Sequence, residues 1–395
     1  MTRALRTARY GAILTFVLAG LMVGTMTVRI PAMTDKLGLS DSAVGTILLA
    51  WGLGALVTMQ AMRGVMARMG SKAVLRIGGP LTAVSMLGIA YAPTLPWLLA
   101  AAALFGMSFG IVDVAMNAQG STVERAAGRP LMNGMHAGWC VGAMSAGLFG
   151  SLSIALGLSM TANLTIMAVI CLPLIVLIGR TYLPDAPASA SAETRVRHRM
   201  PPIVYLLGAI MFLAFMVEGV VADWNGLFMR DTLGAPEAVA ALGYPVFELG
   251  MLLARVTGDR LRARFGVKGM MTASGLATAG FFLVVLTAPT PVVALAAMFF
   301  VGMGVATIAP MTMSLAGTST AQSGPAIAQA GAMGYAGLLL GPVVIGFLSD
   351  ATSLHTALGL AVVLGAMIAL LARFLPRPRA FGASREEERE LAHAA

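Results

Sequence analysis

The amino-acid sequence predicts an all-α membrane protein with twelve transmembrane helices in two six-helix bundles, a 6+6 parallel pseudo-repeat. Three observations lead to this fold class. Only 11% of the 395 residues are Asp, Glu, Lys or Arg, whereas an ordinary soluble domain has roughly a quarter. The charges lie between apolar runs of about 20 residues, the length that a helix needs to cross a bilayer. The two halves of the chain also share motifs at one constant offset.

Charged residues, prolines and Gly/Ser clusters divide the chain into twelve spans. A helix is expected for each span because it satisfies its own backbone hydrogen bonds in lipid. A transmembrane barrel would need alternating polar residues along strands of about ten residues, and these runs do not alternate. The predicted spans are 10–31, 41–63, 73–92, 96–122, 134–156, 160–181, 202–229, 237–258, 268–288, 291–317, 325–349 and 354–375.

An offset of 196 residues relates the two halves. It places 53–72 on 249–268 without gaps, and seven of the twenty positions are identical. Further glycines fall on glycines at this offset, as for Gly106 and Gly302. Because six is an even number of crossings, both copies enter the membrane from the same side, as parallel repeats do.

The longest interior break separates the two copies. It begins with a stretch rich in Pro, Ala and Ser and ends with three arginines, as is typical of a linker. We therefore expect an N-terminal six-helix bundle at 1–182, a cytoplasmic linker at 183–201, a C-terminal six-helix bundle at 202–376 and a cytoplasmic tail at 377–395.

The basic residues predict the orientation of the chain. Of the 26 Lys and Arg residues, all except Arg29, Lys36 and Arg230 fall on one side when alternate loops are assigned to opposite sides. The positive-inside rule places that side in the cytoplasm. The sequence thus predicts a multi-pass membrane protein with both termini in the cytoplasm.

The residue pattern excludes several classes of chemistry. Cys140 and Cys171 lie singly in apolar runs, without the spacing of metal ligands or of a disulfide framework. The phosphate-loop motif of ATP-driven pumps is absent, and so is a catalytic triad. We expect no enzyme activity, no cofactor, no metal and no nucleic acid partner. We expect a monomer that is embedded in the lipid bilayer.

The twelve spans, the 6+6 repeat, the central basic linker and a basic motif after spans 2 and 8 resemble the major facilitator superfamily over essentially the whole chain. The loop motif of that family runs roughly Gly-x-x-x-Asp-Arg-x-Gly-Arg-Arg. Ala67 stands at the acid position of the first copy and Ala263 at that of the second, so the loop is expected to be coupled to the helix ends differently. The resemblance implies alternating access, in which two bundles rock about a midplane site lined mainly by helices 1, 4, 7 and 10.

A second stretch is more specific. Asp113-Val-Ala-Met-Asn117-Ala-Gln119 in helix 4 is similar to a poorly characterised subgroup of bacterial inner-membrane transporters. More distantly it resembles the fucose–proton symporters, which carry an acid and, four residues later, an Asn in helix 4. Those symporters have a second acid before the Pro of helix 1, where this chain has Thr27, so their mechanism does not carry over whole. The Gly-Pro that drug antiporters carry in helix 5 is absent there, and Gly341-Pro342 lies in helix 11 instead.

Ionisable groups inside membrane spans are costly, so they are candidate functional groups. Asp113, deep in helix 4, is the first candidate for proton coupling; the alternatives are a static pair with Arg29 and a helix-packing hydrogen bond. Glu218 in helix 7 is the second candidate. Asp223 lies nearer the end of that helix, where a solvated interfacial acid is an alternative. His136 in helix 5 could relay protons or form a helix–helix hydrogen bond.

Polar and aromatic side chains in the spans are candidates for binding a substrate. Arg29 could instead extend to the outer interface, and Trp224 could anchor helix 7 at the membrane surface. The substrate-binding candidates are Arg29, Asn117, Gln119, Asn133, Trp139, Trp224, Asn225, Gln329 and Tyr335.

Charged residues near the cytoplasmic helix ends predict a structural network at the gate. Glu248 and Arg255 are seven residues apart and share one face of helix 8, and Asp259 follows Arg255 by four. The candidates for this gating or structural charge network are Arg68, Lys72, Glu248, Arg255, Asp259 and Arg264.

These observations favour a secondary active transporter that is coupled to protons. The polar Asn, Gln and Trp residues favour a small polar solute such as a sugar. The low aromatic content argues against a broad drug site, and the excess of interior acids over interior cations argues against a polyanionic substrate. The alternatives are proton-driven efflux of drugs or metabolites and a membrane sensor that transports nothing.

Overall fold

A computed structural model describes residues 2–128, 131–185, 200–320 and 323–376, and the described residues form helices and connecting turns without strands. Twelve of these helical segments are long and apolar enough to cross a membrane. The predicted all-α fold with twelve spans is therefore confirmed. The predicted linker and tail lie largely outside the described residues, which stop at 185, resume at 200 and end at 376.

The helices follow one another along the chain with short connections. Two long helices, α3 and α9, each contain two spans joined at a kink. The elements are α1 (Arg3–Val28), α2 (Ile30–Leu37), α3 (Asp41–Ala90), α4 (Leu95–Ala127), α5 (Met132–Ala155), α6 (Met160–Ile178), α7 (Pro202–Leu227), the π-helix η1 (Phe228–Thr232), α8 (Glu237–Ala240), α9 (Gly243–Leu286), α10 (Pro291–Val305), α11 (Ile308–Thr318), α12 (Ser323–Ala351) and α13 (Leu354–Ala372).

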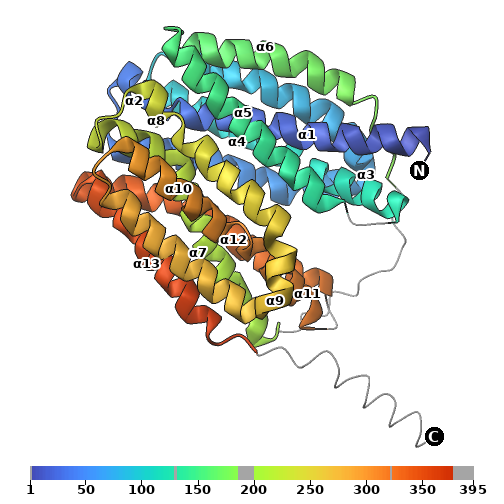
Figure 1. The fold of residues 1–395 in the computed structure, drawn as a ribbon. Helices are drawn as coiled ribbons and strands as arrows, with labels where there is room; N and C mark the ends of the chain where they lie inside the picture. The colour runs from blue at the N-terminus through green and yellow to red at the C-terminus, as the bar shows by residue number, and fades with distance from the viewer. Residues whose placement is uncertain (1, 129–130, 186–199, 321–322, 377–395) are drawn as a thin grey trace, which may run out of the picture.

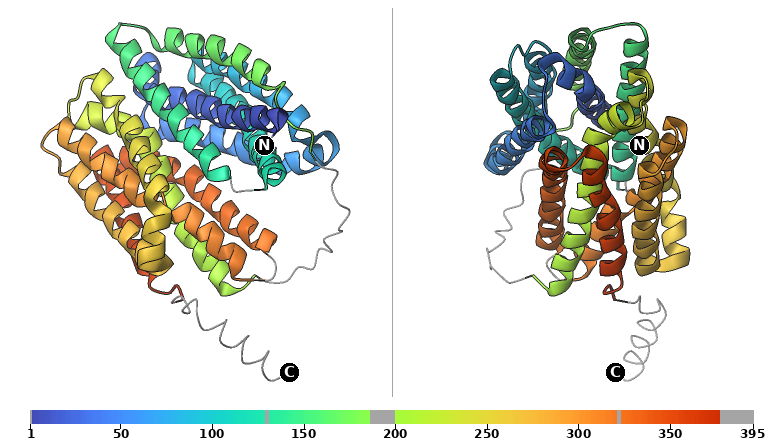
Figure 2. Two further views of the ribbon diagram at one scale, coloured as in Figure 1. Left: turned by 45° about the vertical axis from the view of Figure 1, so that its right-hand side comes forward. Right: turned by 90° about the vertical axis from the view of Figure 1, so that its left-hand side faces the viewer.

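The helices gather into two bundles. Figure 1 shows α1 to α6, coloured blue to green, above α7 to α13, coloured yellow-green to red. The views in Figure 2 keep the two groups separate. The bundles pack on each other through α3 against α12 and α5 against α9, and the backbones of Gly45 and Gly346 touch at the first of these contacts.

The internal repeat predicted at an offset of 196 residues recurs in the backbone. Gly70 and Gly266 both have positive φ, 73° and 68°, at the kinks of α3 and α9. Gly38 and Gly234, also 196 apart, have φ of 61° and 66°. Only glycine adopts this conformation at little cost, so both copies use it to turn the chain between spans.

Close helix packing also repeats. A Cβ at Gly106 in α4 would overlap the carbonyl oxygen of Trp51 in α3, and a Cβ at Gly302 in α10 would overlap that of Phe247 in α9. The second pair lies 196 residues after the first pair in the chain. Small residues thus let the backbones of neighbouring membrane helices touch.

We expect Gly106→Leu to lower the thermal stability of the detergent-purified protein. The new side chain has to displace the α3 backbone, and overpacking of this kind costs about 1–3 kcal/mol. Gly280→Leu is the matched control, since a Cβ at Gly280 meets no atom within 4 Å. Equal melting temperatures for the two variants would show that this contact is not tightly packed.

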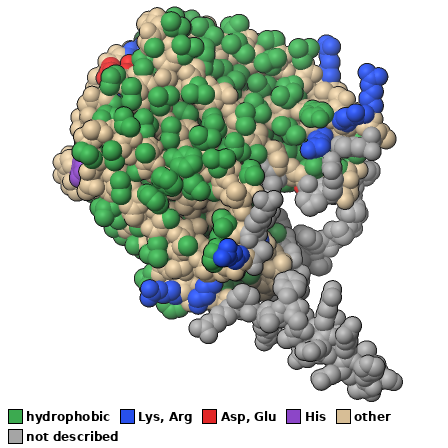
Figure 3. Space-filling model, in the orientation of Figure 1, with side chains coloured by type: hydrophobic (Ala, Val, Ile, Leu, Met, Phe, Trp, Pro, Cys, Tyr) green, Lys and Arg blue, Asp and Glu red, His purple; other side chains and the backbone are tan. Residues whose placement is uncertain are grey.

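The surface fits a bilayer. Figure 3 shows hydrophobic side chains spread over the visible face and Lys and Arg at its upper-right and lower margins. Large apolar side chains such as Val57, Val169, Val256 and Val292 are more than 60% exposed. Without hydrocarbon around it, so much exposed apolar surface would make the protein aggregate.

Several span boundaries differ from those predicted. The first span begins at Arg3 rather than at 10 and ends at Val28, and α2 then makes a separate helix. The helices of the second and eighth spans continue past the predicted ends at 63 and 258 to the kinks at Gly70 and Gly266. Sequence reasoning ended each run at a charged residue, whereas a helix continues through Arg and Lys that extend past its apolar length.

Candidate functional site

A cavity of about 370 Å³ lies between the two bundles, within the size range of small-molecule sites. The N-terminal bundle lines it with residues of α1, α3, α4 and α5, and the C-terminal bundle with residues of α7, α9 and α12. Most of the lining side chains are apolar. The polar and aromatic ones are Thr27, Trp51, Phe109, Trp139, Glu218, Asp223, Tyr244 and Tyr335.

Two carboxylates reach this cavity from one helix. Glu218 and Asp223 both lie on α7, and the described lining residues include no Lys, Arg or His. Only 8% of Asp223 is exposed, so the structure does not fit the alternative of an interfacial, solvated acid. The two predicted acids of helix 7 are therefore brought to one site, together with Trp139 and Tyr335 from the predicted binding set.

Asp113 connects the bundles beside the cavity. The Tyr335 hydroxyl of α12 donates to Oδ2 of Asp113 in α4 across 3.0 Å. The amide of Asn117, one turn along α4, donates to Oδ1 across 3.3 Å and to the Asp113 carbonyl oxygen across 2.8 Å. The predicted pair of Asp113 and Asn117 thus lies on one face, and it gains a partner from the opposite bundle.

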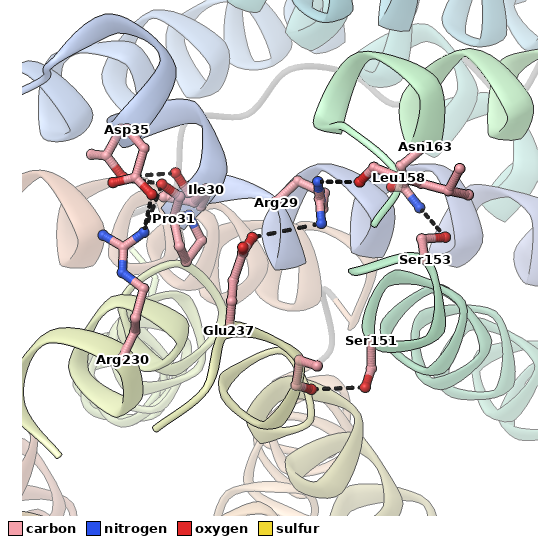
Figure 4. A network of polar contacts seen from close by, with 12 residues as sticks. Arg29, Ile30, Pro31, Asp35, Ser151, Ser153, Leu158, Asn163, Arg230 and Glu237 are labelled. Carbon is pink, nitrogen blue, oxygen red and sulfur yellow. Dashed lines mark hydrogen bonds and ion pairs between the residues drawn. The ribbon is translucent and has the colours of Figure 1, made fainter. Parts of the chain in front are cut away.

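Arg29 is not the counter-ion of Asp113. It is 3% exposed, its Nη2 donates to the Leu158 carbonyl oxygen at 3.2 Å, and its Nη1 lies 3.6 Å from Oε1 of Glu237 in α8. Figure 4 shows it pointing between the bundles. Two interpretations of Arg29 are therefore wrong, that it pairs with Asp113 and that it extends to the outer interface. Arg29 is buried in the protein, and its ionic partner is Glu237 of the opposite bundle.

Further polar contacts join the bundles at this end of the molecule. Arg230 of η1 donates to Asp35 at 2.8 Å and to the Pro31 carbonyl oxygen at 3.0 Å, and Ser151 donates to the Ala238 carbonyl oxygen at 2.7 Å (Figure 4). Ser349 also donates to Asp41. The end that holds α2 and α8 is thus closed by contacts between the bundles.

Glu248 and Arg255 form no direct ion pair in the described part of the chain, but each charge acts on the other and both side chains lie beside Cys140. Arg255 in α9 instead donates from Nη1 to the sulfur of Cys140 in α5, across 2.9 Å and across the bundles. Glu248 is 1% exposed, and its Oε2 has no hydrogen-bond partner. The side chain of Asp259 lies outside the described residues, so its place in the predicted network stays a prediction.

The other predicted network residues lie at the kinks. Arg68 and Arg264 are exposed, and the Arg264 guanidinium lies over the Phe265 ring at 5.4 Å. Lys72 is partly buried. The acid missing at position 67 has a substitute that sequence reasoning missed. Asp185 accepts hydrogen bonds from the backbone N–H and hydroxyl of Ser71, next to the kink at Gly70, and from Thr122 at 3.0 Å.

Other predicted binding residues lie away from the cavity. Trp224 is fully buried and its indole donates to the Pro342 carbonyl oxygen at 3.0 Å, so the interface-anchor interpretation is wrong. Asn225 is buried with neither amide atom hydrogen-bonded. Gln119 lies beside Ser71 and the backbone of Leu183, and Gln329 is partly buried on α12.

In α5, His136 makes an edge contact with the ring of Phe16, with 5.0 Å between centroids. Trp139, one turn further, packs against Phe109 at 5.8 Å and lines the cavity. The side chain of Asn133 lies outside the described residues. Of the candidates in α5 whose side chains are described, Trp139 is the one that lines the cavity.

Sequence reasoning missed Trp51 and Tyr244 as lining residues. Trp51 is one of four tryptophans in the chain, and an aromatic residue inside a polar-poor span is a usable signal. Tyr244 is also an aromatic residue inside a predicted span, but which way it points depends on how α9 packs against the opposite bundle.

Comparison with known proteins agrees with this architecture. The family model of the Major Facilitator Superfamily matches residues 12–221 and 207–394. An uncharacterized transporter of Sinorhizobium fredii is 30% identical over 379 residues, covering 94% of this chain and 99% of that protein.

Two solved structures have the same fold. A mutant of the nucleoside transporter NupG superimposes with a TM-score of 0.77 at 17% identity, covering 94% of this chain and 99% of that one. A D-xylose–proton symporter superimposes with a TM-score of 0.76 at 17% identity, covering 94% and 98%. With the family model matching nearly the whole chain, this protein belongs to the major facilitator superfamily and is a membrane transporter, not an enzyme.

Proposed function

We propose that this transporter couples proton movement to the import of a small, hydroxylated, sugar-like solute across the bacterial inner membrane by alternating access. The observation that carries the proposal is the hydrogen bond between Tyr335 and Asp113, which links the two bundles through a carboxyl group beside the cavity. A bond of this kind has to break or re-form when the bundles rock, and protonation of the carboxyl group changes its strength.

Asp113 is the proton site in this proposal, and Glu218 is a second one. An acid buried among apolar groups binds and releases protons more readily near neutral pH than a solvated one. His136 of α5 is not a main proton site in this proposal, because its ring packs against Phe16 of α1.

Several features support a hydroxylated ring as substrate. Aromatic side chains from both bundles line the cavity, together with two carboxylates and the Thr27 hydroxyl. Flat rings pack on the apolar face of a sugar, while carboxylates accept its hydroxyl hydrogen bonds. The two solved structures compared above, described as a nucleoside transporter and a D-xylose–proton symporter, fit this class.

Orientation completes the proposal. With both termini in the cytoplasm, the end closed by Arg29–Glu237 and Arg230–Asp35 faces the periplasm, as in an inward-facing state. A C-terminal alkaline phosphatase fusion should then be inactive and a C-terminal fluorescent protein fusion bright. An active phosphatase fusion would contradict this orientation.

Thermal stabilisation of the purified protein tests the substrate class. A ligand that binds the native state raises its stability by mass action. A panel of pentoses, hexoses, polyols, nucleosides and lipophilic cations should give shifts with sugar-like solutes and none with the lipophilic cations.

Proton-driven efflux of drugs or metabolites is the second candidate. The mainly apolar lining of the cavity favours it, since amphipathic drugs bind to such walls. Shifts with several lipophilic cations and with no sugar would replace the first proposal by this one.

A further inference from the structure

Asp223 differs from the other buried acids by its lack of partners. Its carboxylate lines the cavity, only 8% of the residue is exposed, and it makes no hydrogen bond or ion pair with the described residues. Asp113 has Tyr335 and Asn117 as partners. Glu218 interacts electrostatically with the Arg255 guanidinium, whereas Asp223 has no comparable cation among the side chains that the structure describes.

An unpaired carboxylate in a mostly apolar cavity is costly in free energy. A membrane protein can reduce this cost by binding a proton, or by binding a ligand that brings the missing positive charge. The lining residues supply no such charge, because none of those described is Lys, Arg or His.

The wall opposite α7 is suited to a cation. Trp51, Phe109 and Trp139 of the N-terminal bundle face the cavity, and the rings of Phe109 and Trp139 are 5.8 Å apart. The faces of aromatic rings attract ammonium groups, more strongly when water is excluded. A ligand in the cavity would meet aromatic rings of the N-terminal bundle and a free carboxylate of the C-terminal bundle.

We propose that Asp223 is a specificity-determining residue that binds a protonated amine, so that the preferred substrates are hydroxylated ring solutes that carry an amino group, such as amino sugars. This inference rests on the proposed transport of sugar-like solutes and narrows it. Glu218 and Asp113 remain available for protons, so amine binding and proton binding use different carboxyl groups.

The test compares three sugars that differ at one position: glucosamine, N-acetylglucosamine and glucose. Their binding to the purified full-length protein is measured by calorimetry. We expect glucosamine to bind about tenfold to a hundredfold more tightly than the other two, which is the usual size of one charge-assisted hydrogen bond.

Three variants assign the preference to this carboxylate. Asp223→Asn, which keeps the shape of the side chain, should reduce glucosamine binding to the level of glucose. Asp223→Glu should retain the preference, and so should Tyr205→Phe, which changes an exposed side chain of α7 outside the cavity. Monodisperse elution and an unchanged melting temperature establish that each variant is folded.

Three outcomes would overturn the inference: equal binding of glucose and glucosamine, absence of glucosamine binding, or an amine preference that persists in Asp223→Asn. Proton-driven transport of neutral sugars without amine preference would remove the inference and leave the proposed function intact. The absence of proton-driven transport for every sugar and every amine would remove the proposed function itself.

Discussion

Asp113→Asn should abolish proton-driven accumulation of substrate while leaving the protein folded. Asn keeps the shape of the side chain and can still accept a hydrogen bond from Tyr335, but it cannot bind or release a proton. Loss of a group that must transfer a proton lowers rates by about a hundredfold or more. The measurement is uptake into proteoliposomes under an inward proton gradient.

Substrate exchange separates this role from a structural one. Exchange across a membrane without a gradient needs the rocking motion but no net proton transfer, so we expect Asp113→Asn to keep it. Tyr10→Phe, at an exposed position on α1, should retain both activities. Accumulation at the wild-type level in Asp113→Asn would remove Asp113 from the mechanism.

Glu237→Gln should shift the conformational equilibrium away from the state described here. Arg29 is buried, and Glu237 is the acid that it approaches across the bundles. Without the charge of Glu237, the Arg29 guanidinium is buried without an opposing charge when this end is closed. When the bundles separate, water solvates the guanidinium, so the substitution destabilises the closed state relative to the open one. A loss of about 1.4 kcal/mol from the closed state shifts the equilibrium tenfold.

Spin labels measure this shift. Pro93 and Pro289 are exposed residues at the closed end, one on each bundle, and cysteines placed there report the separation of the bundles. In a background without Cys140 and Cys171, Glu237→Gln should increase the population at long distance. Asp35→Asn, which removes an ion pair with a 65% exposed carboxylate, should change it much less, since exposed pairs contribute about 0–1 kcal/mol. Identical distributions for both variants would mean that Arg29–Glu237 does not hold this end closed.

The sequence was enough to predict most of the fold. Apolar length is nearly a direct measure of a membrane span, and the offset of 196 residues identified the repeat that reappears in Gly70 and Gly266. The boundaries were less accurate where helices continue through charged residues, as at Arg3 and Arg264. Hydropathy reports where the bilayer begins and not where the helix begins.

The site was predicted in part. A carboxyl group in an apolar run is recognisable without a structure, and Asp113, Glu218 and Asp223 all lie in or beside the cavity. Partners from the other bundle were not recognisable, because the pairings of Arg29 with Glu237 and of Arg255 with Cys140 depend on how far the bundles have rocked. Trp224 looked like a membrane anchor because sequence alone does not reveal which face of a uniformly apolar helix is buried.

The most direct test of proton-coupled import is solute uptake into proteoliposomes with an imposed inward proton gradient, compared with the same vesicles after an ionophore has collapsed it. The solutes are those that stabilise the purified protein. We expect transient accumulation of the solute above the external concentration with the gradient and simple equilibration without it. Equal uptake under both conditions would contradict proton coupling. The protein would then be a transporter that is not driven by protons.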